Sequence, residues 1–243
     1  MSKPFVSVCT PTYNRRKFIP NIIKCFKNQD YPSELLEWII LDDGTEKISD
    51  LFKDKDLKER MTYIKLQNKM PIGAKRNYLN SIAKGEIIVY FDDDDYYPPE
   101  RVSYAVEALT NSPSALCAGS SELHIYFNHI GKMYQSGPFH SKHATAGTFA
   151  FFRELLDETC FDDNATKSEE SSFLKGFTIP FVQLNPIYTT LMFSHDENTF
   201  DKKKILENPN NNEKYFKISN KTISDFIKYD YEEDLKSNYL DYK

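Results

Sequence analysis

Gly85-Glu86-Ile87-Ile88-Val89-Tyr90-Phe91-Asp92-Asp93-Asp94-Asp95 is the stretch of this 243-residue chain that decides its fold class and indicates its chemistry. Its apolar, β-branched part is typical of a buried parallel strand. The strand runs directly into four consecutive carboxylates, and two unit charges about 4 Å apart repel by roughly 4 kcal/mol in a partly buried site. A fold that gathers these charges at a strand end is therefore expected to supply a cation.

The spacing of the four aspartates suggests which of them act together. Side chains alternate along an extended backbone, so Asp92 and Asp94 are predicted to face one side and Asp93 and Asp95 the other. Such a D-x-D pair offers two hard oxygen ligands to Mg²⁺ or Mn²⁺ and leaves positions open for phosphate oxygens. An acidic turn before a helix explains the same residues equally well, because Asp is favoured there. The cluster alone does not decide between the two.

Strand and helix patterns alternate on both sides of this stretch. Such alternation is typical of βαβ units and predicts an α/β fold with a mainly parallel sheet. Ligands of such sheets bind outside the carboxyl ends of the strands. Strands predicted at 5–10, 38–41 and 87–91 end in polar residues that should share one crevice: Thr12-Tyr13, Asp42-Asp43 and Asp92 to Asp95.

The pattern changes after a predicted helix at 101–109. Residues 1–110 are expected to form the half that carries the crevice, and 111–200 a smaller half with short strands, together one domain at 1–200. A charged, Asn-rich extension follows at 201–243, with a helix predicted at 218–229 and a last dozen residues that fray.

The composition excludes several classes of protein. A formal net charge of -5 does not favour a general nucleic-acid binder, and no apolar run approaches the roughly 20 residues that span a bilayer. The chain enters a strand almost at once, so we expect no signal peptide. The four cysteines are widely separated and are expected to be reduced thiols. We therefore expect a soluble, cytoplasmic protein whose oligomeric state the sequence does not indicate.

Five segments, in this order and at this spacing, resemble the GT-A fold glycosyltransferases of family 2: Val6 to Asn14, Ile39 to Thr45, Gly73 to Asn77, Gly85 to Asp95, and Pro99 to Arg101. The second half of the chain matches the family more loosely. The resemblance implies a GT-A domain with a central mainly parallel sheet and a smaller mixed sheet on the acceptor side. It also implies metal-assisted, inverting transfer of a sugar from a nucleotide-diphosphate donor to a hydroxyl of a glycan or another acceptor.

The resemblance also implies where the nucleotide lies. It places the Pro11-Thr12-Tyr13 turn against the base, where the Tyr13 ring can stack. Asp43 corresponds to the acidic residue that accepts a hydrogen bond from uracil in the family, with Asp42 beside it, and this match favours a UDP-sugar. A core aromatic residue and a plain Asp-Gly turn are the ordinary alternatives for these positions.

The diphosphate and the metal involve two further segments. Arg76 lies in the first turns of a helix that starts near Gly73, where the helix dipole and the guanidinium both favour an anion. A surface arginine is the alternative. The match makes Asp94 the metal ligand, with Asp92 as its D-x-D partner, and lets Asp93 reach the ribose. Bound Mn²⁺ or Mg²⁺ would stabilise the departing nucleoside diphosphate.

The catalytic base and a third metal ligand are expected in the second half. An acceptor hydroxyl must lose its proton as it attacks the anomeric carbon. Glu170 resembles the residue of the family that takes this proton, with Glu169 as the second candidate, although the family usually has Asp at that position. An ordinary acidic first helical turn is the alternative. His195 is the candidate third ligand or a structural histidine, and 146–149 resembles a turn on the acceptor side.

Two rival functions are compatible with parts of this pattern. A sugar nucleotidyltransferase usually has a Gly-rich loop after its first strand, whereas Pro11-Thr12-Tyr13-Asn14 stands here without a glycine. An inactive GT-A module that only binds sugar or assembles with partners would not need its carboxylates. Glu in place of the usual Asp keeps this second alternative open.

Overall fold

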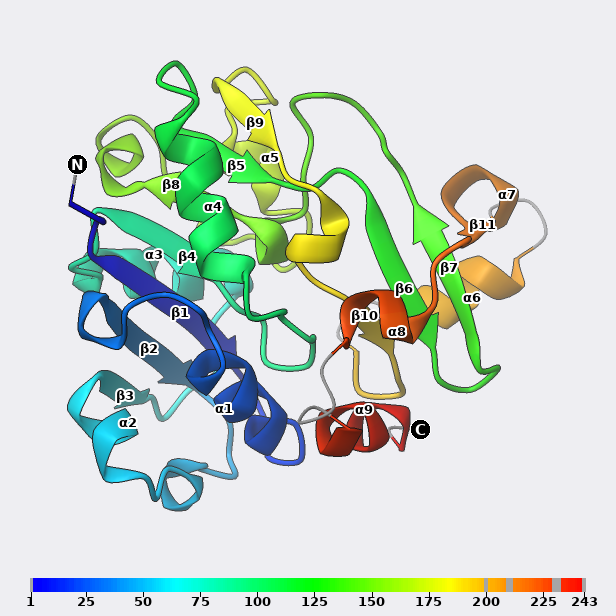
Figure 1. Ribbon diagram of the computed structural model, residues 1–243, viewed down its shortest axis with the longest axis horizontal. Coiled ribbons are helices and arrows are strands. Elements are labelled where there is room, and N and C mark those ends of the chain that lie inside the picture. Colours follow the sequence, from blue (N-terminus) through cyan, green and yellow to red (C-terminus); the bar gives the residue numbers. More distant parts are fainter. Residues whose placement is uncertain (1, 199–200, 209–211, 229–232, 242–243) are drawn as a thin grey trace.

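The computed structural model describes residues 2–198, 201–208, 212–228 and 233–241, and the chain in it is built around a seven-stranded sheet (Figure 1). Its strand order is β3-β2-β1-β4-β8-β5-β9. The strands are β1 (Val6–Thr12), β2 (Leu36–Asp42), β3 (Met61–Lys65), β4 (Ile87–Tyr90), β5 (Cys117–Gly119), β8 (Ala150–Phe152) and β9 (Phe181–Gln183). Only β8 runs antiparallel to its neighbours, so the predicted mainly parallel sheet is confirmed.

Helices cover both faces of this sheet. Strand residues alternate between two apolar clusters, as the period of two requires. Val8 and Trp38 pack on the side of α1 (Ile19–Lys27) and α4 (Arg101–Thr110), whereas Ile39 and Ile88 pack on the side of α3 (Ile72–Ile82) and α5 (Glu170–Phe173). Figure 1 shows α1 and α4 in front of the sheet and α3 behind it. The predicted helices at 72–84 and 101–109 are confirmed to within two residues.

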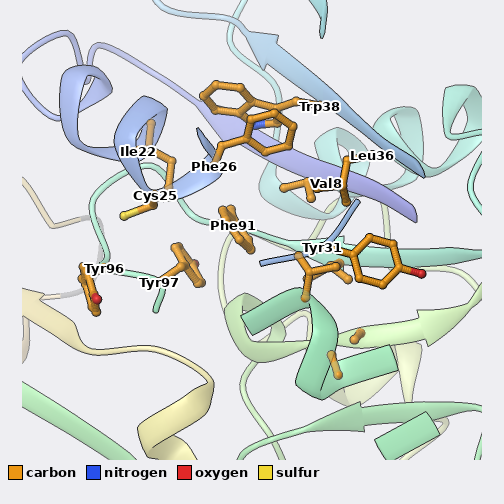
Figure 2. Close-up of a cluster of buried hydrophobic side chains, with 14 of the residues drawn as sticks. Val8, Ile22, Cys25, Phe26, Tyr31, Leu36, Trp38, Phe91, Tyr96 and Tyr97 are labelled. Carbon is orange, nitrogen blue, oxygen red and sulfur yellow. The ribbon is translucent and has the colours of Figure 1, made fainter. Parts of the chain in front are cut away.

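Aromatic rings fill the part of the core that contains Phe91 and Tyr97 (Figure 2), which stand before and after the acidic turn at residues 92–95. The Trp38 ring stacks on Phe26 at 4.8 Å between centroids, and Phe91 stacks on Tyr97 at 4.0 Å. All four residues are at most 1% exposed. Large buried rings dominate the energetics of a core. The strand ends that carry the polar residues therefore stand on a closely packed base.

A second, four-stranded sheet has the order β10-β6-β7-β11. It contains β6 (Leu123–Phe127), β7 (Lys132–Ser136), β10 (Met192–Ser194) and β11 (Lys217–Ile218). Its pairings are mixed: β10 runs parallel to β6, whereas β7 runs antiparallel to β6 and β11 runs antiparallel to β7. The predicted smaller mixed sheet is confirmed, and Figure 1 shows it beside the central sheet.

Short helices complete the described chain. The α-helices are α2 (Lys55–Glu59), α6 (Lys202–Glu207), α7 (Asn212–Tyr215), α8 (Ile223–Phe226) and α9 (Glu233–Leu240). The 3-10 helices are Ser33–Leu35, Ser49–Leu51, Ala146–Thr148, Arg153–Asp157 and Pro186–Tyr188.

One prediction for the C-terminal extension is wrong. The helix expected at 218–229 is limited to α8, because Ile218 pairs with Tyr134 as a strand and Thr222 caps a new helix; residue 229 itself lies outside the described residues. The described part of the last dozen residues, which were expected to fray, is helical. It forms α9, whose Tyr239 is fully buried and stacks on Phe193 at 4.4 Å.

Candidate functional site

The carboxyl ends of β1, β2 and β4 lie side by side at one edge of the central sheet. Thr12 is in register with Asp42, and the N–H of Asp43 donates to the Thr12 carbonyl at 3.3 Å. On the other side of β1, the N–H of Phe91 donates to the carbonyl of Cys9 at 3.0 Å. The three polar strand ends predicted to meet are therefore neighbours. We call this edge, formed by residues 12–14, 42–44 and 92–95, the donor edge.

Asp42 and Asp43 are both buried and engaged within the protein. Asp43 accepts a hydrogen bond from Lys75 Nζ at 2.5 Å and another from the Met70 N–H at 2.7 Å. Asp42 accepts a hydrogen bond from the Tyr63 hydroxyl, so one oxygen of this carboxylate is used within the protein. These contacts fix the Asp43 carboxylate at the donor edge, and a carboxylate retains lone pairs for a further donor.

Lysines flank the ring predicted to stack on the base. Lys69 Nζ lies 4.1 Å from the centroid of the half-buried Tyr13 ring, and Lys75 Nζ lies 5.8 Å from it. Sequence reasoning assigned no role to either lysine. Lys75 stands directly before Arg76 within the segment that resembles the family, which is the signal that could have found it.

Arg76 joins the donor edge to the second half of the chain. Its Nε donates to Glu169 Oε1 at 2.9 Å, and its Nη2 donates to Asp92 Oδ1 at 3.1 Å. Its Cζ lies 4.5 Å from the centroid of the Tyr90 ring, and its side chain is 3% exposed. Burial opposes the charge, but the carboxylates of Asp92 and Glu169 outweigh it and raise the pKa of Arg76. The guanidinium is thus a fixed positive charge beside the acidic turn.

Two glycines allow close approaches around this arginine. A Cβ on Gly73 would lie 1.9 Å from the carbonyl oxygen of Asp162, and a Cβ on Gly147 would lie 2.4 Å from Asp92 Oδ2. The second contact places the Ala146–Thr148 turn, expected on the acceptor side, against the acidic turn. Arg101, fully buried, donates to the carbonyl of Thr148 at 2.8 Å and holds this turn in place.

The four aspartates do not alternate as predicted. The strand ends at Tyr90, and Asp93 and Asp94 lie in a turn, so the extended backbone that alternation requires is missing. Arg15 Nε lies 3.7 Å from Asp93 Oδ1 and 3.8 Å from Asp94 Oδ2, so these two carboxylates share one cation. Asp95 turns inward and accepts from the N–H of Phe193 at 3.4 Å.

His195, at the end of β10, contacts Asp94. Its Nε2 lies 3.2 Å from Asp94 Oδ2, which also accepts from Asn198 Nδ2 at 3.2 Å. Burial would raise the pKa of Asp94, but the hydrogen bond with His195 and the nearby positive charges lower it to about 2. Burial together with the charge of Asp94 raises the pKa of Asp93 well above its usual range. Sequence reasoning missed Asn198.

Asp94 and His195 provide the oxygen and nitrogen atoms that a divalent ion can bind. In the described residues, no three His, Cys, Asp or Glu side chains come together as a ready-made metal site. Asp94 and His195 nevertheless present two donor atoms 3.2 Å apart. Mg²⁺ is usually held by one or two carboxylates plus substrate phosphates, with the remaining positions filled by water. The third predicted ligand, Asp92, is paired with Arg76.

The candidate bases differ in their surroundings. Glu169, 9% exposed at its side chain, is held by Arg76, whereas Glu170 begins α5 and is only partly buried. Within the described residues, no other side chain pairs with the Glu170 carboxylate. Burial and the neighbouring charge of Glu169 raise the pKa of Glu170. The helix predicted at 169–175 is shorter than expected, because Lys175, Gly176 and Phe177 adopt positive φ values of 48°, 64° and 64°.

Comparison with known proteins relates this site to one family. The model of "Glycosyl transferase family 2" matches residues 7–160. The chain is 37% identical over 113 residues to a GalNAc(5)-diNAcBac-PP-undecaprenol beta-1,3-glucosyltransferase of Campylobacter jejuni, a match that covers 44% of this chain and 33% of that protein. The matched segments make up 39%, 33% and 42% of the first three curated relatives, so the chain spans well under half of their lengths.

Solved structures show the same fold. The mannosyltransferase PcManGT of Pyrobaculum calidifontis, in complex with GDP-Man and Mn²⁺, superposes with a TM-score of 0.65 at 18% identity, covering 82% of this chain and 59% of that one. TarS of S. aureus in complex with UDP-GlcNAc gives a TM-score of 0.61 at 19% identity, covering 80% and 60%. Among the described residues, no helix combines the length and apolar character needed to cross a membrane.

Proposed function

This chain belongs to glycosyl transferase family 2, and we propose that it transfers a sugar from a nucleotide-diphosphate donor, with UDP favoured, to a hydroxyl of a glycan or another acceptor. One observation carries the proposal. Arg76 pairs with Asp92 of the donor edge and with Glu169, the neighbour in sequence of the candidate base Glu170, and this ion-pair network supports a site that spans both halves of the chain.

The nucleotide would occupy the donor edge. The base would stack on the Tyr13 ring, beside the lysines that already lie over that ring, and Asp43, held by Lys75, offers an acceptor to a ring N–H. A uracil N–H matches an acceptor at that position, which supports a UDP-sugar. Asp93 would contact the ribose, while Pro11, Thr12 and Gly73 would shape the backbone around the nucleotide.

The leaving diphosphate would be stabilised by positive charge. Asp94 and His195, with Asp92 as a further ligand, would hold Mn²⁺ or Mg²⁺, and that ion supplies Lewis-acid stabilisation of the departing diphosphate. Arg76, whose charge is fixed by burial between two carboxylates, adds a preorganised cation beside it. The structurally similar mannosyltransferase PcManGT contains Mn²⁺, which is compatible with this arrangement.

Glu170 would act as the base. It would accept the proton of the acceptor hydroxyl while that oxygen attacks the anomeric carbon from the face opposite the leaving group, so the configuration at that carbon inverts. Glu169 is engaged with Arg76 and would position the segment, whereas Glu170 is available to an acceptor. Its raised pKa brings it closer to the operating pH than an ordinary glutamate.

A donor assay tests this function. The protein would be incubated with UDP-glucose, UDP-GlcNAc, UDP-GalNAc and GDP-mannose in Mn²⁺, with a mixture of simple saccharides as acceptors, and the released nucleoside diphosphate measured. We expect release from one donor class and a product of inverted configuration by NMR. Folded protein that releases nucleotide from none of the donors, with or without metal, would support the inactive module instead.

A further inference from the structure

Arg15 follows the Tyr13-Asn14 turn, and its side chain points at the acidic turn. Asn14 adopts a positive φ of 53°, and its Oδ1 accepts from the N–H of Thr45 at 2.7 Å and the N–H of Glu46 at 3.2 Å. The loop is therefore tied to the end of β2. The Arg15 side chain is 13% exposed, so it is mostly buried against the donor edge.

Carboxylates surround the Arg15 guanidinium without bonding to it. Its Nε lies 3.7 Å from Asp93 Oδ1 and 3.8 Å from Asp94 Oδ2, and its Nη1 lies 3.7 Å from Glu197 Oε2. An N–H···O hydrogen bond spans about 2.7–3.2 Å. Among the described residues, no side-chain hydrogen bond of Arg15 satisfies this limit. The guanidinium balances the charge of the cluster while its N–H groups remain available.

Two neighbouring arginines, Arg16 and Arg76, donate side-chain hydrogen bonds to protein acceptors. Arg16 donates to the Lys47 carbonyl at 3.0 Å and to Asp50 Oδ1 at 2.9 Å. Arg76 donates to Glu169 and to Asp92, as described above. Arg76 Nη1 is buried without a hydrogen-bond partner, so one of its donors is also unused. Of these three arginines, Arg15 is the one that donates no side-chain hydrogen bond to any described residue, although it is mostly buried.

We propose that Arg15 binds the diphosphate of the donor. In the absence of the donor it is the counter-ion of Asp93 and Asp94; when the donor arrives with its metal, the guanidinium exchanges these carboxylates for phosphate oxygens. A guanidinium forms bidentate hydrogen bonds to phosphate. A metal ion on Asp94 repels the guanidinium, whereas the diphosphate attracts both cations. This inference rests on the proposed function and adds Arg15 to the residues that bind the donor.

The test compares Arg15→Gln with Arg16→Gln, which changes the adjacent residue of the same type. Binding of UDP with Mn²⁺, and of uridine, would be measured by calorimetry, and binding of Mn²⁺ alone by electron paramagnetic resonance. We expect Arg15→Gln to weaken UDP binding by about 10- to 100-fold, as for the loss of charged hydrogen bonds. Uridine binding should stay within about twofold of the unmodified protein, as should every binding value for Arg16→Gln. Mn²⁺ binding should not weaken, because Arg15→Gln removes a cation that lies beside Asp94. Arg15→Lys, which keeps the charge without the fork, should be intermediate.

The outcomes separate this inference from the proposed function. Equal weakening of uridine and UDP by Arg15→Gln would show a structural role and overturn the inference, as would unchanged UDP binding. In both of these cases the unmodified protein binds UDP, so the proposed function stands. If the unmodified protein bound neither UDP nor uridine, the proposed function would fail and this inference with it.

Discussion

The two regions that build the site are held in different ways. The donor edge consists of residues that directly follow three adjacent strands, and hydrogen bonds of the central sheet place them. The other region consists of three segments that return to this edge from far along the chain: 168–173, 194–198 and α9. These returning segments meet the donor edge through individual side-chain contacts, such as Arg76 with Glu169 and His195 with Asp94, and buried residues such as Phe173 and Tyr239 anchor them in the core.

This difference separates chemistry from architecture. The donor edge is placed by its sheet, whereas the returning segments reach it through contacts between residues far apart in the sequence. We therefore expect that substitutions of these contact residues have separable effects on turnover, on stability and on the attachment of the acidic turn. The following predictions test that separation, from the largest expected effect to the smallest.

Replacing the candidate base should affect turnover alone. We expect Glu170→Gln to lower kcat by about 10²–10⁴-fold, the usual contribution of a positioned proton acceptor. Binding of UDP with Mn²⁺, measured by calorimetry, should not change, because Glu170 is assigned to the acceptor hydroxyl and not to the nucleotide or the metal. A variant with unchanged turnover would refute the assignment of the base and leave the family membership intact.

Replacing the arginine that connects the two regions should affect stability. Arg76→Gln leaves the mostly buried Glu169 and the partner Asp92 without their cation, and breaking such a pair costs about 3–5 kcal/mol. Urea unfolding measures this loss. Arg76→Lys, as the matched control, keeps the charge and should lose less. A Gln variant as stable as the unmodified protein would mean that the network does not hold the regions together.

The pH dependence should report the same base. Burial raises the pKa of Glu170, and only its deprotonated form accepts a proton, so kcat/KM should fall about tenfold per pH unit below that raised pKa. The midpoint should lie above the ordinary glutamate value of about 4.3. The residual activity of Glu170→Gln should lack this limb. The same limb in both proteins would assign it to another group.

The smallest effect is expected at α9. The Tyr239 hydroxyl donates to the Asp95 carbonyl at 2.7 Å, which ties the last described helix to the acidic turn. Tyr239→Phe keeps the ring stacked on Phe193 and removes this bond, so we expect a loss of about 1 kcal/mol in unfolding free energy. No loss would show that the ring and not the hydroxyl attaches α9, whereas a loss of several kcal/mol would show that the hydroxyl contributes more than this one hydrogen bond.

Much of the donor edge could be predicted from the sequence, and the structure confirms its fold. The reason is local: Asp43 and Asp92 follow buried strands by one or two residues, and parallel strands bring their carboxyl ends to one edge. The roles assigned to these residues remain predictions. The orientation of the aspartates could not be predicted, because it depends on a turn that starts where β4 ends at Tyr90.

The returning segments were predictable only through family resemblance. Glu169 contacts Arg76 across 93 positions, and Asn198 contacts Asp94 across 104. No local pattern encodes such pairs, because they depend on how the second sheet packs beside the first. Tyr239 lies 144 positions from Asp95, in a region whose charged composition suggested a frayed end. The sequence shows an arginine at position 15, but the direction in which its side chain points depends on the backbone of Asn14, whose φ is positive.

The most direct test of donor binding at this edge is the melting temperature with UDP, GDP and dTDP, each in Mn²⁺ and in EDTA. A ligand at about 100 times its Kd stabilises by about 2.7 kcal/mol, which is about 5–10 °C for a chain of this size. We expect UDP to give this shift in Mn²⁺ and a much smaller one in EDTA, and we expect Asp94→Asn to lose the difference between the two conditions. No shift with any nucleoside diphosphate in either condition would contradict a nucleotide-sugar site at the donor edge.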